Sequence, residues 1–338
     1  MLIVMQSQAT TEQVKEVVHR IESMGLDAHP MPGSTRTAIG ITGNTAAIDP
    51  SRLTGLAGVR EMIRVTKPFK LASREMQVDD SRVAIGPVTV EPKSFVVIAG
   101  PCSVESEEIM LQTAEFLLDS GVSLLRAGAF KPRTSPYSFQ GLEHEGLRRL
   151  ESTRNATGVC IVTEVMEPEQ VDAVAASADV VQIGTRNMQN FPLLKRVGKC
   201  GKPVLLKRGM SATLEEWLMA AEYILAGGNK DVILCERGVR TFANHTRNTL
   251  DLSVVPCVKD QSHLPVLVDP SHGTGRRDFV IPMALASLAA GADGIMVEIH
   301  PDPEQAVSDG AQTMNFDQFT RMMQSLRQIA APLGRTIC

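Results

Sequence analysis

The residues best suited to do chemistry are basic side chains that lie within or just after short apolar segments. They are Arg126, Lys131, Arg133, Arg186, Lys207 and Arg237. One phosphate rarely needs more than a bidentate arginine and a few backbone donors. Six cations in a chain of net charge −4 therefore favour a ligand with two phosphates, or with a phosphate and a carboxylate. The alternative is that some of them pair with neighbouring strands or face solvent.

A second group combines sulfur, nitrogen and oxygen donors. It consists of Cys102, His272, Glu298 and Asp309, with His300 as a rival ligand. Thiolate, imidazole and carboxylate groups bind divalent transition metals, and a mixed set accepts several of these ions. Each residue also has an ordinary explanation, because cysteines are often buried apolar groups and aspartates often occupy turns. The residues by themselves leave both interpretations open.

These side chains need elements that bring them together, and eight short apolar runs meet that need. The runs cover residues 95–100, 123–129, 160–165, 180–184, 204–208, 232–237, 266–269 and 294–300. Amphipathic segments separate the runs, as expected for eight βα units of a (β/α)8 barrel over residues 94–338. A doubly wound open sheet is the alternative, but no Gly-x-Gly-x-x-Gly follows an early strand. A barrel would gather the polar residues at the carboxyl ends of its strands.

The first 66 residues predict a separate α+β unit with the order βαββαβ. Strands are expected at 2–5, 27–31, 37–42 and 59–65, and helices at 11–24 and 46–56. Thr10 or Thr11 can cap the first helix and Gly25 can end it. This order is typical of a ferredoxin-like fold. We therefore predict a ferredoxin-like domain at 1–66, a linker with a barrel-capping hairpin around Gly86 at 67–93, and the barrel at 94–338.

Composition and charge exclude several classes of protein. The longest apolar runs are too short to span a bilayer, and the first residues lack the basic segment of a secretory signal, so we expect a cytoplasmic protein. The six cysteines show no Cys-x-x-Cys spacing and are expected to be reduced thiols. A sequence pI of about 6.0 argues against a nucleic-acid partner.

Six longer motifs carry a family resemblance. They are IAGPCS (98–103), RAGAFKPRTS (126–135), GTRNMQNF (184–191), LKRG (206–209), CERG (235–238) and DPSH (269–272). Together they closely resemble 3-deoxy-D-arabino-heptulosonate 7-phosphate (DAHP) synthase, in the subtype that carries an N-terminal ferredoxin-like regulatory domain. The resemblance implies a metal-dependent, aldol-like condensation of phosphoenolpyruvate with erythrose 4-phosphate, the first step of the shikimate pathway. The divalent ion could be Mn²⁺, Co²⁺, Zn²⁺, Cd²⁺ or Fe²⁺.

The resemblance also implies roles for individual residues. Phosphoenolpyruvate would be held by Arg126, Lys131, Arg186, Lys207 and Arg237, the aldose phosphate by Arg133 and Thr134, and the metal by Cys102, His272, Glu298 and Asp309. A fixed cation, for which Lys131 is the candidate, would meet the charge that develops in the reaction. Glu164 and His300 are both candidates for handling protons on the water that adds to the substrate.

The N-terminal domain implies regulation, with an aromatic amino acid as effector and His29 as a regulatory-site candidate, in a homo-oligomer of two or four chains. The domain could instead only build subunit contacts. The nearest rival function is 3-deoxy-D-manno-octulosonate 8-phosphate synthase, which uses arabinose 5-phosphate. The sequence from Lys131 to Ser135 and the N-terminal domain argue against it. A catalytically silent, ligand-sensing barrel is the alternative of another class, and the intact metal set argues against that.

Overall fold

The computed structural model describes residues 1–338 apart from 34–35, 44–47, 50, 64–66, 133–134 and 136. The chain forms two compact units. One comprises Met1–Asp80 together with Gln261–His263, and the other comprises Ser81–Asp260 and Leu264–Cys338. The first contains a small antiparallel sheet and the second a parallel barrel.

The smaller unit has the predicted ferredoxin-like order of elements. Its elements are β1 (Leu2–Met5), α1 (Thr11–Ser23), β2 (Asp27–Pro32), β3 (Thr37–Thr42), α2 (Ser51–Thr54) and β4 (Val59–Ile63). The strands pair antiparallel in the order β2-β3-β1-β4. The helix expected over 46–56 is shorter among the described residues, and its predicted start lies partly outside them. The end of the last predicted strand, at 64–65, also lies outside.

Helix α1 shows why this unit folds as its sequence predicts. The side chain of Thr10 accepts a hydrogen bond from the backbone of Gln13, whose own side chain accepts one from the backbone of Thr10. Gly25 follows the helix with φ +74°, a conformation that glycine adopts without strain. Val17 and Ile21 are fully buried in the core beneath the sheet. Capping and an apolar face therefore agree on the same helix.

The larger unit is the predicted (β/α)8 barrel. Its strands are β7 (Ser94–Gly100), β8 (Leu124–Arg126), β9 (Cys160–Val165), β10 (Val180–Ile183), β11 (Val204–Lys207), β12 (Val232–Glu236), β13 (Val266–Val268) and β14 (Gly294–Glu298). Neighbouring strands pair in parallel, and β14 pairs with β7 to close the ring. Strand β8 is shorter than the predicted 123–129. After Arg126 the chain leaves the ladder, since the backbone of Gly128 bonds to Cys102 instead.

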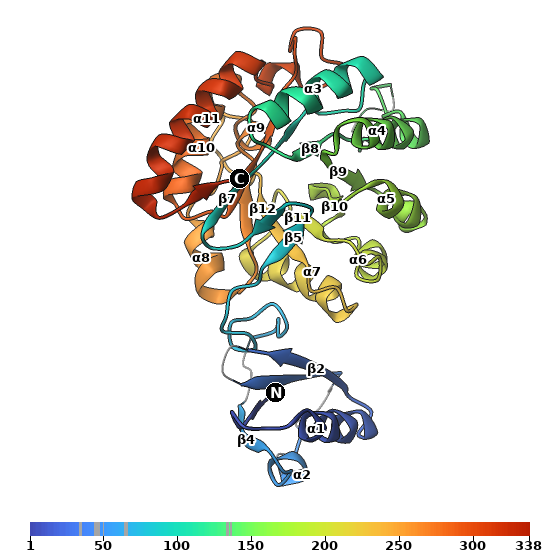
Figure 1. Ribbon diagram of the computed structural model, residues 1–338, viewed down its shortest axis with the longest axis vertical. Helices are drawn as coiled ribbons and strands as arrows, with labels where there is room; N and C mark the ends of the chain where they lie inside the picture. The colour runs from blue at the N-terminus through green and yellow to red at the C-terminus, as the bar shows by residue number, and fades with distance from the viewer. Residues whose placement is uncertain (34–35, 44–47, 50, 64–66, 133–134, 136) are drawn as a thin grey trace. The chain divides into compact units, whose positions relative to one another are not determined.

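Helices surround the closed sheet (Figure 1). They are α3 (Glu107–Asp119), α4 (Glu143–Thr157), α5 (Val171–Ser177), α6 (Phe191–Val197), α7 (Leu214–Ala226), α8 (Val254–Gln261), α10 (Arg277–Ala289) and α11 (Phe316–Ala330). A short extra helix, α9 (Pro270–Thr274), follows β13 directly. The strands are buried throughout, as expected for a parallel sheet covered on both faces.

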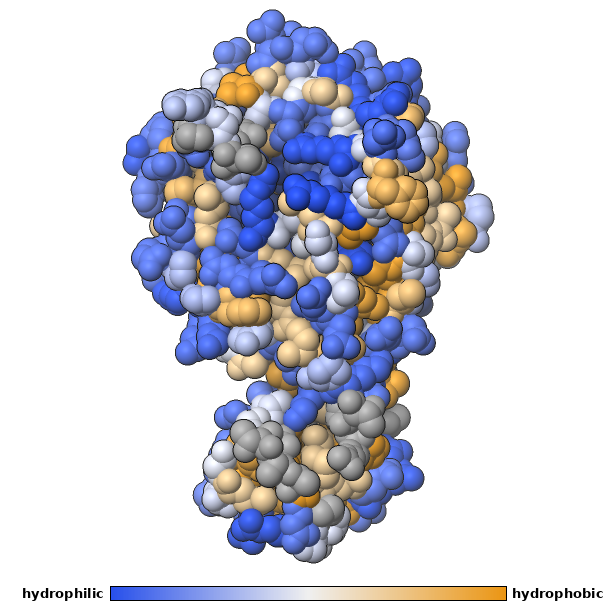
Figure 2. Space-filling view, turned by 180° about the vertical axis from the view of Figure 1, so that it is seen from behind, coloured by the Kyte–Doolittle hydropathy of each residue, from blue (hydrophilic) through white to orange (hydrophobic). Residues whose placement is uncertain are grey.

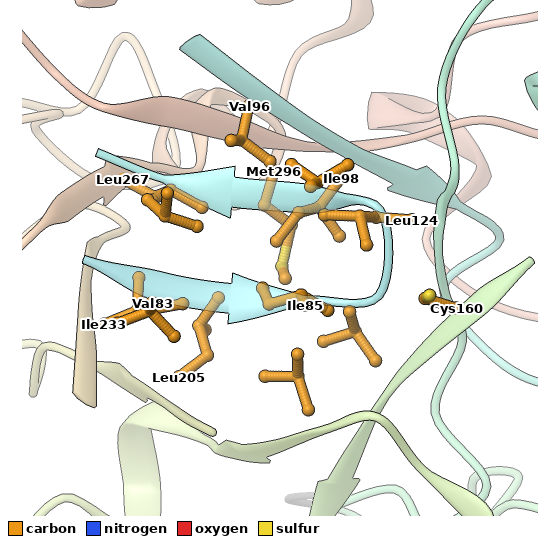
Figure 3. Packing of buried hydrophobic residues seen from close by; sticks show 14 of the residues in the cluster. Val83, Ile85, Val96, Ile98, Leu124, Cys160, Leu205, Ile233, Leu267 and Met296 are labelled. Carbon is orange, nitrogen blue, oxygen red and sulfur yellow. The ribbon is translucent and has the colours of Figure 1, made fainter. Parts of the chain in front are cut away.

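A hairpin closes the amino-terminal end of the barrel. Strands β5 (Val83–Ile85) and β6 (Val88–Val90) pair antiparallel around Gly86, which has φ +53°. Their apolar side chains pack against residues near the starts of the barrel strands, including Val96, Leu205 and Leu267 (Figure 3). This apolar floor leaves the carboxyl ends of the strands as the end of the barrel that is available for ligands.

Arg335 holds the C-terminal segment beside the amino-terminal end of the barrel. Strand β15 (Thr336–Ile337) pairs with β7, and the Arg335 guanidinium donates to backbone carbonyls at Ser94 (3.1 Å), Gly291 (2.9 Å) and Ala292 (2.8 Å). Only 11% of this side chain is exposed, and it lies 3.6 Å from the buried carboxylate of Asp293.

We expect Arg335→Ala to lower the free energy of unfolding by about 2–4 kcal/mol, because hydrogen bonds to a charged group contribute about 1.5–3 kcal/mol each and the carbonyls would stay buried. Urea unfolding measures this change. Arg321→Ala, at an exposed position on α11, is the control and should change the stability by less than about 0.5 kcal/mol. Equal stability of the two variants would contradict this stabilising role of Arg335.

Candidate active site

A cavity of about 470 Å³ opens at the carboxyl ends of the barrel strands. The charged and titratable residues that line it are Arg126, Lys131, Glu164, Arg186, Lys207, Arg237, Arg240, Arg247, His272 and Asp309. Figure 2 shows hydrophilic side chains gathered around a hollow on this face of the larger unit. Cations outnumber carboxylates among these described residues, so the cavity suits an anionic ligand.

The cavity contains most of the cations that the sequence pointed out. Five of them line it, namely Arg126, Lys131, Arg186, Lys207 and Arg237. Arg133 and Thr134, expected at the aldose phosphate, lie outside the described residues. The five come from positions at or after the ends of β8, β10, β11 and β12, as a barrel requires.

Two of these cations are buried in ion pairs with residues at the end of the next strand but one in the barrel. Arg126 donates from Nη1 to Glu298 Oε1 (3.0 Å) and to the carbonyl of Pro101 (2.9 Å). Lys207 donates from Nζ to the carboxylate of Asp269. For these two residues, the alternative that the cations serve in ion pairs within the protein is therefore partly correct. The Nε of Arg126 is nevertheless buried without a hydrogen-bond partner in the described part of the chain, which leaves one donor for a ligand.

Arg237 is a buried cation that a bound anion would stabilise. Its side chain is buried, and it pairs with no carboxylate of the described residues. Burial lowers the pKa of the Arg237 guanidinium, the nearby charge of Asp269 raises it, and the positive charge of Arg247 lowers it. A buried cation close to a second cation is costly unless a counter-charge arrives. A bound phosphate or carboxylate would supply that charge.

Beside the cations lies a group of four side chains that could together hold a metal ion. Cys102 follows β7, His272 lies in α9, Glu298 ends β14, and Asp309 precedes the short helix η3 (Gly310–Gln312). One ligand atom from each lies within 4.8 Å of all the others. Cys102 Sγ is 3.0 Å from Asp309 Oδ2, and His272 Nε2 is 3.3 Å from Glu298 Oε1.

These distances fit a single ion. Atoms that each lie about 2.0–2.3 Å from one ion lie within about 4.6 Å of one another, so small side-chain movements suffice. A mixed set of one sulfur, one nitrogen and two oxygen donors suits a borderline divalent transition metal. His300, the rival ligand, is not in the group.

Asp269 orients the histidine of this group. As N-cap of α9, its Oδ1 accepts from the backbone N–H of His272 (2.9 Å) and its Oδ2 from His272 Nδ1 (2.7 Å). The other ring nitrogen, Nε2, therefore faces Glu298 and is available to a metal. Burial would raise the pKa of Asp269, but the charges of His272 and Lys207 and the hydrogen bonds from His272 hold it well below its usual range.

Burial raises the pKa of both Cys102 and Asp309, but the neighbouring groups outweigh it only for Asp309. Burial, with the negative charge of Glu298, raises the pKa of the Cys102 thiol, although Lys131 Nζ lies 3.0 Å from its sulfur. Burial would also raise the pKa of Asp309. The hydrogen bond from Cys102 and the charges of His272, Arg247 and Lys131 instead lower it to about 2. A metal ion would favour the thiolate, which is the ligand form of cysteine.

Comparison with known proteins identifies the family. Residues 75–333 match the family described as "DAHP synthetase I family", and residues 1–67 match the "DAHP synthase ferredoxin-like domain". The chain belongs to the DAHP synthetase I family. Both parts of the expected resemblance are thereby confirmed.

Individual relatives agree with this assignment. The chain is 48% identical over 334 residues to the phospho-2-dehydro-3-deoxyheptonate aldolase of Thermotoga maritima, which covers 99% of each chain. A crystal structure of that enzyme from Thermotoga maritima superposes with a TM-score of 0.80 over 100% of this chain and 99% of the other. A truncated form of 3-deoxy-D-arabino-heptulosonate 7-phosphate synthase from Thermotoga maritima matches with a TM-score of 0.76 and 48% identity, covering 80% of this chain and 99% of that one.

Enzymes of the rival function are more distant. The 2-dehydro-3-deoxyphosphooctonate aldolase of Acidithiobacillus ferrooxidans is 33% identical over 254 residues, covering 70% of this chain and 89% of that enzyme. The N-terminal match to the DAHP synthase ferredoxin-like domain points the same way.

In this member of the DAHP synthetase I family, the structure separates the two candidates for proton transfer. Glu164 is the second-last residue of β9 and lines the cavity. Its Oε2 accepts a hydrogen bond from Gln182 (3.1 Å), and its buried Oε1 has no partner among the described side chains and backbone. The Cβ of any larger residue at Gly184 would lie 1.9 Å from that oxygen, so glycine makes room for it. His300 is buried and does not line the cavity.

Sequence reasoning missed several polar residues of this DAHP synthetase I site. Arg240 and Arg247, in the loop after β12, line the cavity, and Arg247 Nη1 lies 3.3 Å from Asp309 Oδ1. Gln312 donates to Glu298 Oε2 (2.6 Å). The rule that loops after barrel strands build the site would have found the two arginines, because they follow Arg237 within the same loop. Nothing in the sequence around Gln312 distinguished it as a site residue.

None of the helices in the described residues is long and apolar enough to cross a membrane.

Proposed function

We propose that this chain is a metal-dependent DAHP synthase, which condenses phosphoenolpyruvate with erythrose 4-phosphate, releases inorganic phosphate and begins the shikimate pathway. The observation that carries the proposal is the cationic cavity directly beside four metal-binding side chains. Two phosphates and one carboxylate match such an excess of cations. The full-length similarity to a DAHP synthase supports the same function.

Phosphoenolpyruvate would occupy the part of the cavity lined by Arg126, Lys131, Arg186, Lys207 and Arg237. Arg237 is a buried cation without a described carboxylate partner, so it is a natural partner of an anionic group of this substrate. The aldose phosphate would be held by Arg133 and Thr134, a role that rests on the family resemblance alone. Arg240 and Arg247 add positive charge at the same cavity.

Cys102, His272, Glu298 and Asp309 would hold the metal, which we propose to be Mn²⁺, Co²⁺, Zn²⁺, Cd²⁺ or Fe²⁺. When bound, such an ion acts as a Lewis acid on an aldehyde oxygen. Asp269 would keep His272 in the tautomer that offers Nε2.

The remaining chemistry falls to side chains of the cavity. As C3 of phosphoenolpyruvate attacks the aldehyde carbon, negative charge develops on the aldehyde oxygen. Lys131, fixed by hydrogen bonds to the carbonyl (2.8 Å) and sulfur of Cys102, is the cation that would meet this charge and supply a proton. Water then adds to C2. Glu164 Oε1, buried and unpartnered among the described residues, would take one proton of this water. The remaining hydroxyl proton then passes to the departing phosphate as the C2–O bond to phosphate breaks and the C2 carbonyl forms.

Phosphoenolpyruvate with an isotopic label in its bridging oxygen tests this function. We expect phosphoenolpyruvate carrying ¹⁸O between C2 and phosphorus, incubated with erythrose 4-phosphate and the metal-loaded protein, to give one DAHP per phosphate. The phosphate should retain the label, because the C2–O bond is the one broken. Mass spectrometry of both products measures this. Phosphate release without erythrose 4-phosphate, or unlabelled phosphate, would contradict the proposal, and no turnover would favour the silent barrel.

We also propose that residues 1–66 regulate the enzyme by binding an aromatic amino acid. His29 in β2 is our candidate contact, and its Nε2 lies 2.7 Å from Thr42 Oγ1 on β3. The candidate catalytic residues all lie in the larger unit, which has its own core. An effector can act only if it binds two states of the protein with different affinity.

A truncation that begins at Val83 is expected to keep turnover and lose inhibition by tyrosine or phenylalanine. The truncated Thermotoga maritima protein covers a similar share of the chain, which supports independent folding of the barrel. Inhibition curves of the two forms decide, after light scattering has established the number of subunits, which we propose to be two or four. Unchanged inhibition in the truncated form would refute regulation. We place the enzyme in the cytoplasm, since its phosphorylated substrates do not cross membranes unaided.

A further inference from the structure

The loop that carries Asp309 needs support from outside the metal-binding group. It runs from the end of β14 to η3, and Asp309 itself has φ +56°, a left-handed conformation that is uncommon for residues other than glycine, asparagine and aspartate. Arg247 contacts Asp309, but 47% of that side chain is exposed to solvent. The buried contacts of the loop must therefore hold the carboxylate in place.

Glu105 makes two of those buried contacts. It lies three residues after Cys102, and its Oε1 accepts from the backbone N–H of Val307 (3.1 Å), two residues before Asp309. Its Oε2 lies 3.3 Å from His300 Nε2. Only 7% of the Glu105 side chain and 1% of that of His300 are exposed. One carboxylate thus joins the segment that carries Cys102 to both ends of the loop that carries Asp309.

The hydrogen bond at Nδ1 of His300 determines which ring nitrogen carries the proton. Nδ1 accepts a hydrogen bond from the backbone N–H of Asp302 (3.0 Å), so Nε2 carries the proton and donates it to Glu105. Both nitrogens are therefore engaged away from the cavity. The ring serves the loop and is not available to water in the active site.

A third buried contact joins the same two segments. Ser103 Oγ and Ser308 Oγ are 2.6 Å apart, and each residue is the immediate neighbour of a member of the metal-binding group, Cys102 or Asp309. The Cys102 sulfur and the Asp309 carboxylate, far apart in the sequence, are 3.0 Å from each other at this junction. The contact between Ser103 and Ser308 helps to keep the Cys102 sulfur and the Asp309 carboxylate at this distance.

We propose that Glu105 and His300 are positioning residues that set the affinity for the metal by holding Asp309 beside Cys102. This inference rests on the proposed metal site, and it replaces the proton-transfer role considered for His300. Outer residues that orient metal ligands commonly change metal affinity by 10- to 100-fold when they are mutated. A role in folding alone would lower the stability and leave the affinity of the folded protein unchanged.

Titration of the full-length, metal-free protein with Co²⁺ tests the proposal, because a cysteine ligand gives a thiolate-to-cobalt absorption that does not depend on turnover. We expect Glu105→Ala to bind Co²⁺ about 10- to 100-fold more weakly than the unmodified protein, and activity lost at low Co²⁺ to return as its concentration rises. Glu107→Ala, at an exposed glutamate two residues along, is the matched control and should bind normally.

Glu105→Gln keeps one of the two acceptor contacts and should weaken Co²⁺ binding about 3- to 10-fold, which preserves the test if Glu105→Ala does not fold. Equal Co²⁺ affinity of the Glu105 variants and the unmodified protein would overturn the positioning role. Absence of the thiolate absorption in the unmodified protein would instead overturn the metal site itself, so the two failures are distinguishable.

Discussion

Replacing Cys102 by alanine is expected to remove the bound metal and the activity together. Cys102 supplies the only sulfur among the four metal-binding side chains of the described group, and it is buried at the carboxyl end of β7. Without it, three donors remain and Lys131 loses a hydrogen-bond partner. We expect kcat/KM to fall by at least about 10³-fold, which corresponds to about 4 kcal/mol of transition-state stabilisation.

Metal content by mass spectrometry and phosphate release measure the two losses. Cys257→Ala, which changes an exposed cysteine, is the matched control and should keep both metal and activity. Chelation of the unmodified protein should abolish turnover, and Mn²⁺, Co²⁺, Zn²⁺ or Cd²⁺ should restore it to differing degrees. Full activity of Cys102→Ala in the presence of a chelator would refute the metal assignment.

The second large effect concerns the division of the cations between the two substrates. Arg186 lines the cavity from the loop after β10, and we expect Arg186→Ala to raise the KM for phosphoenolpyruvate about 10- to 150-fold. The reason is that hydrogen bonds between charged groups contribute about 1.5–3 kcal/mol. The KM for erythrose 4-phosphate should change less than about 3-fold. Arg133→Ala should show the opposite pattern.

Steady-state kinetics with each substrate varied at saturation of the other separate these effects. Arg196→Ala is the control, because Arg196 lies in the following helix α6 and pairs with Asp172 on the surface, where an ion pair contributes little. Equal increases of both KM values in both variants would show that the residues are not divided in this way.

The barrel and its closing hairpin follow from local signals. Apolar runs buried on both faces, with turn residues between them, identify β-strands with their crossover helices, and Gly86 marks the hairpin. Strand ends were less predictable. The apolar residues after Arg126 are typical of a continued strand. The backbone N–H of Ala127 still bonds to Val162 in β9, but that of Gly128 bonds to Cys102 after β7. Such a choice depends on a partner that is remote in the sequence.

The site, too, was predictable only where it did not depend on contacts between residues that are remote in the sequence. Charged residues at strand ends are visible in the sequence, so the cations and the metal-binding group could be identified and the structure brings them together. The direction in which a side chain points was not visible. His300, two positions beyond the end of β14, was as suitable a candidate for proton transfer as Glu164 on the sequence alone. Our inference that its ring supports the loop rests on the contact with Glu105, nearly two hundred residues earlier, which the sequence does not reveal.

The length of the aldose phosphate that is joined to phosphoenolpyruvate, four carbons or five, distinguishes DAHP synthase from its nearest rival. The test is to measure phosphate release from phosphoenolpyruvate at equal concentrations of metal-loaded protein, once with erythrose 4-phosphate and once with arabinose 5-phosphate. We predict a kcat/KM at least about 100-fold higher with erythrose 4-phosphate, equivalent to about 2.7 kcal/mol of discrimination. Equal rates, or faster release with arabinose 5-phosphate, would contradict the assignment.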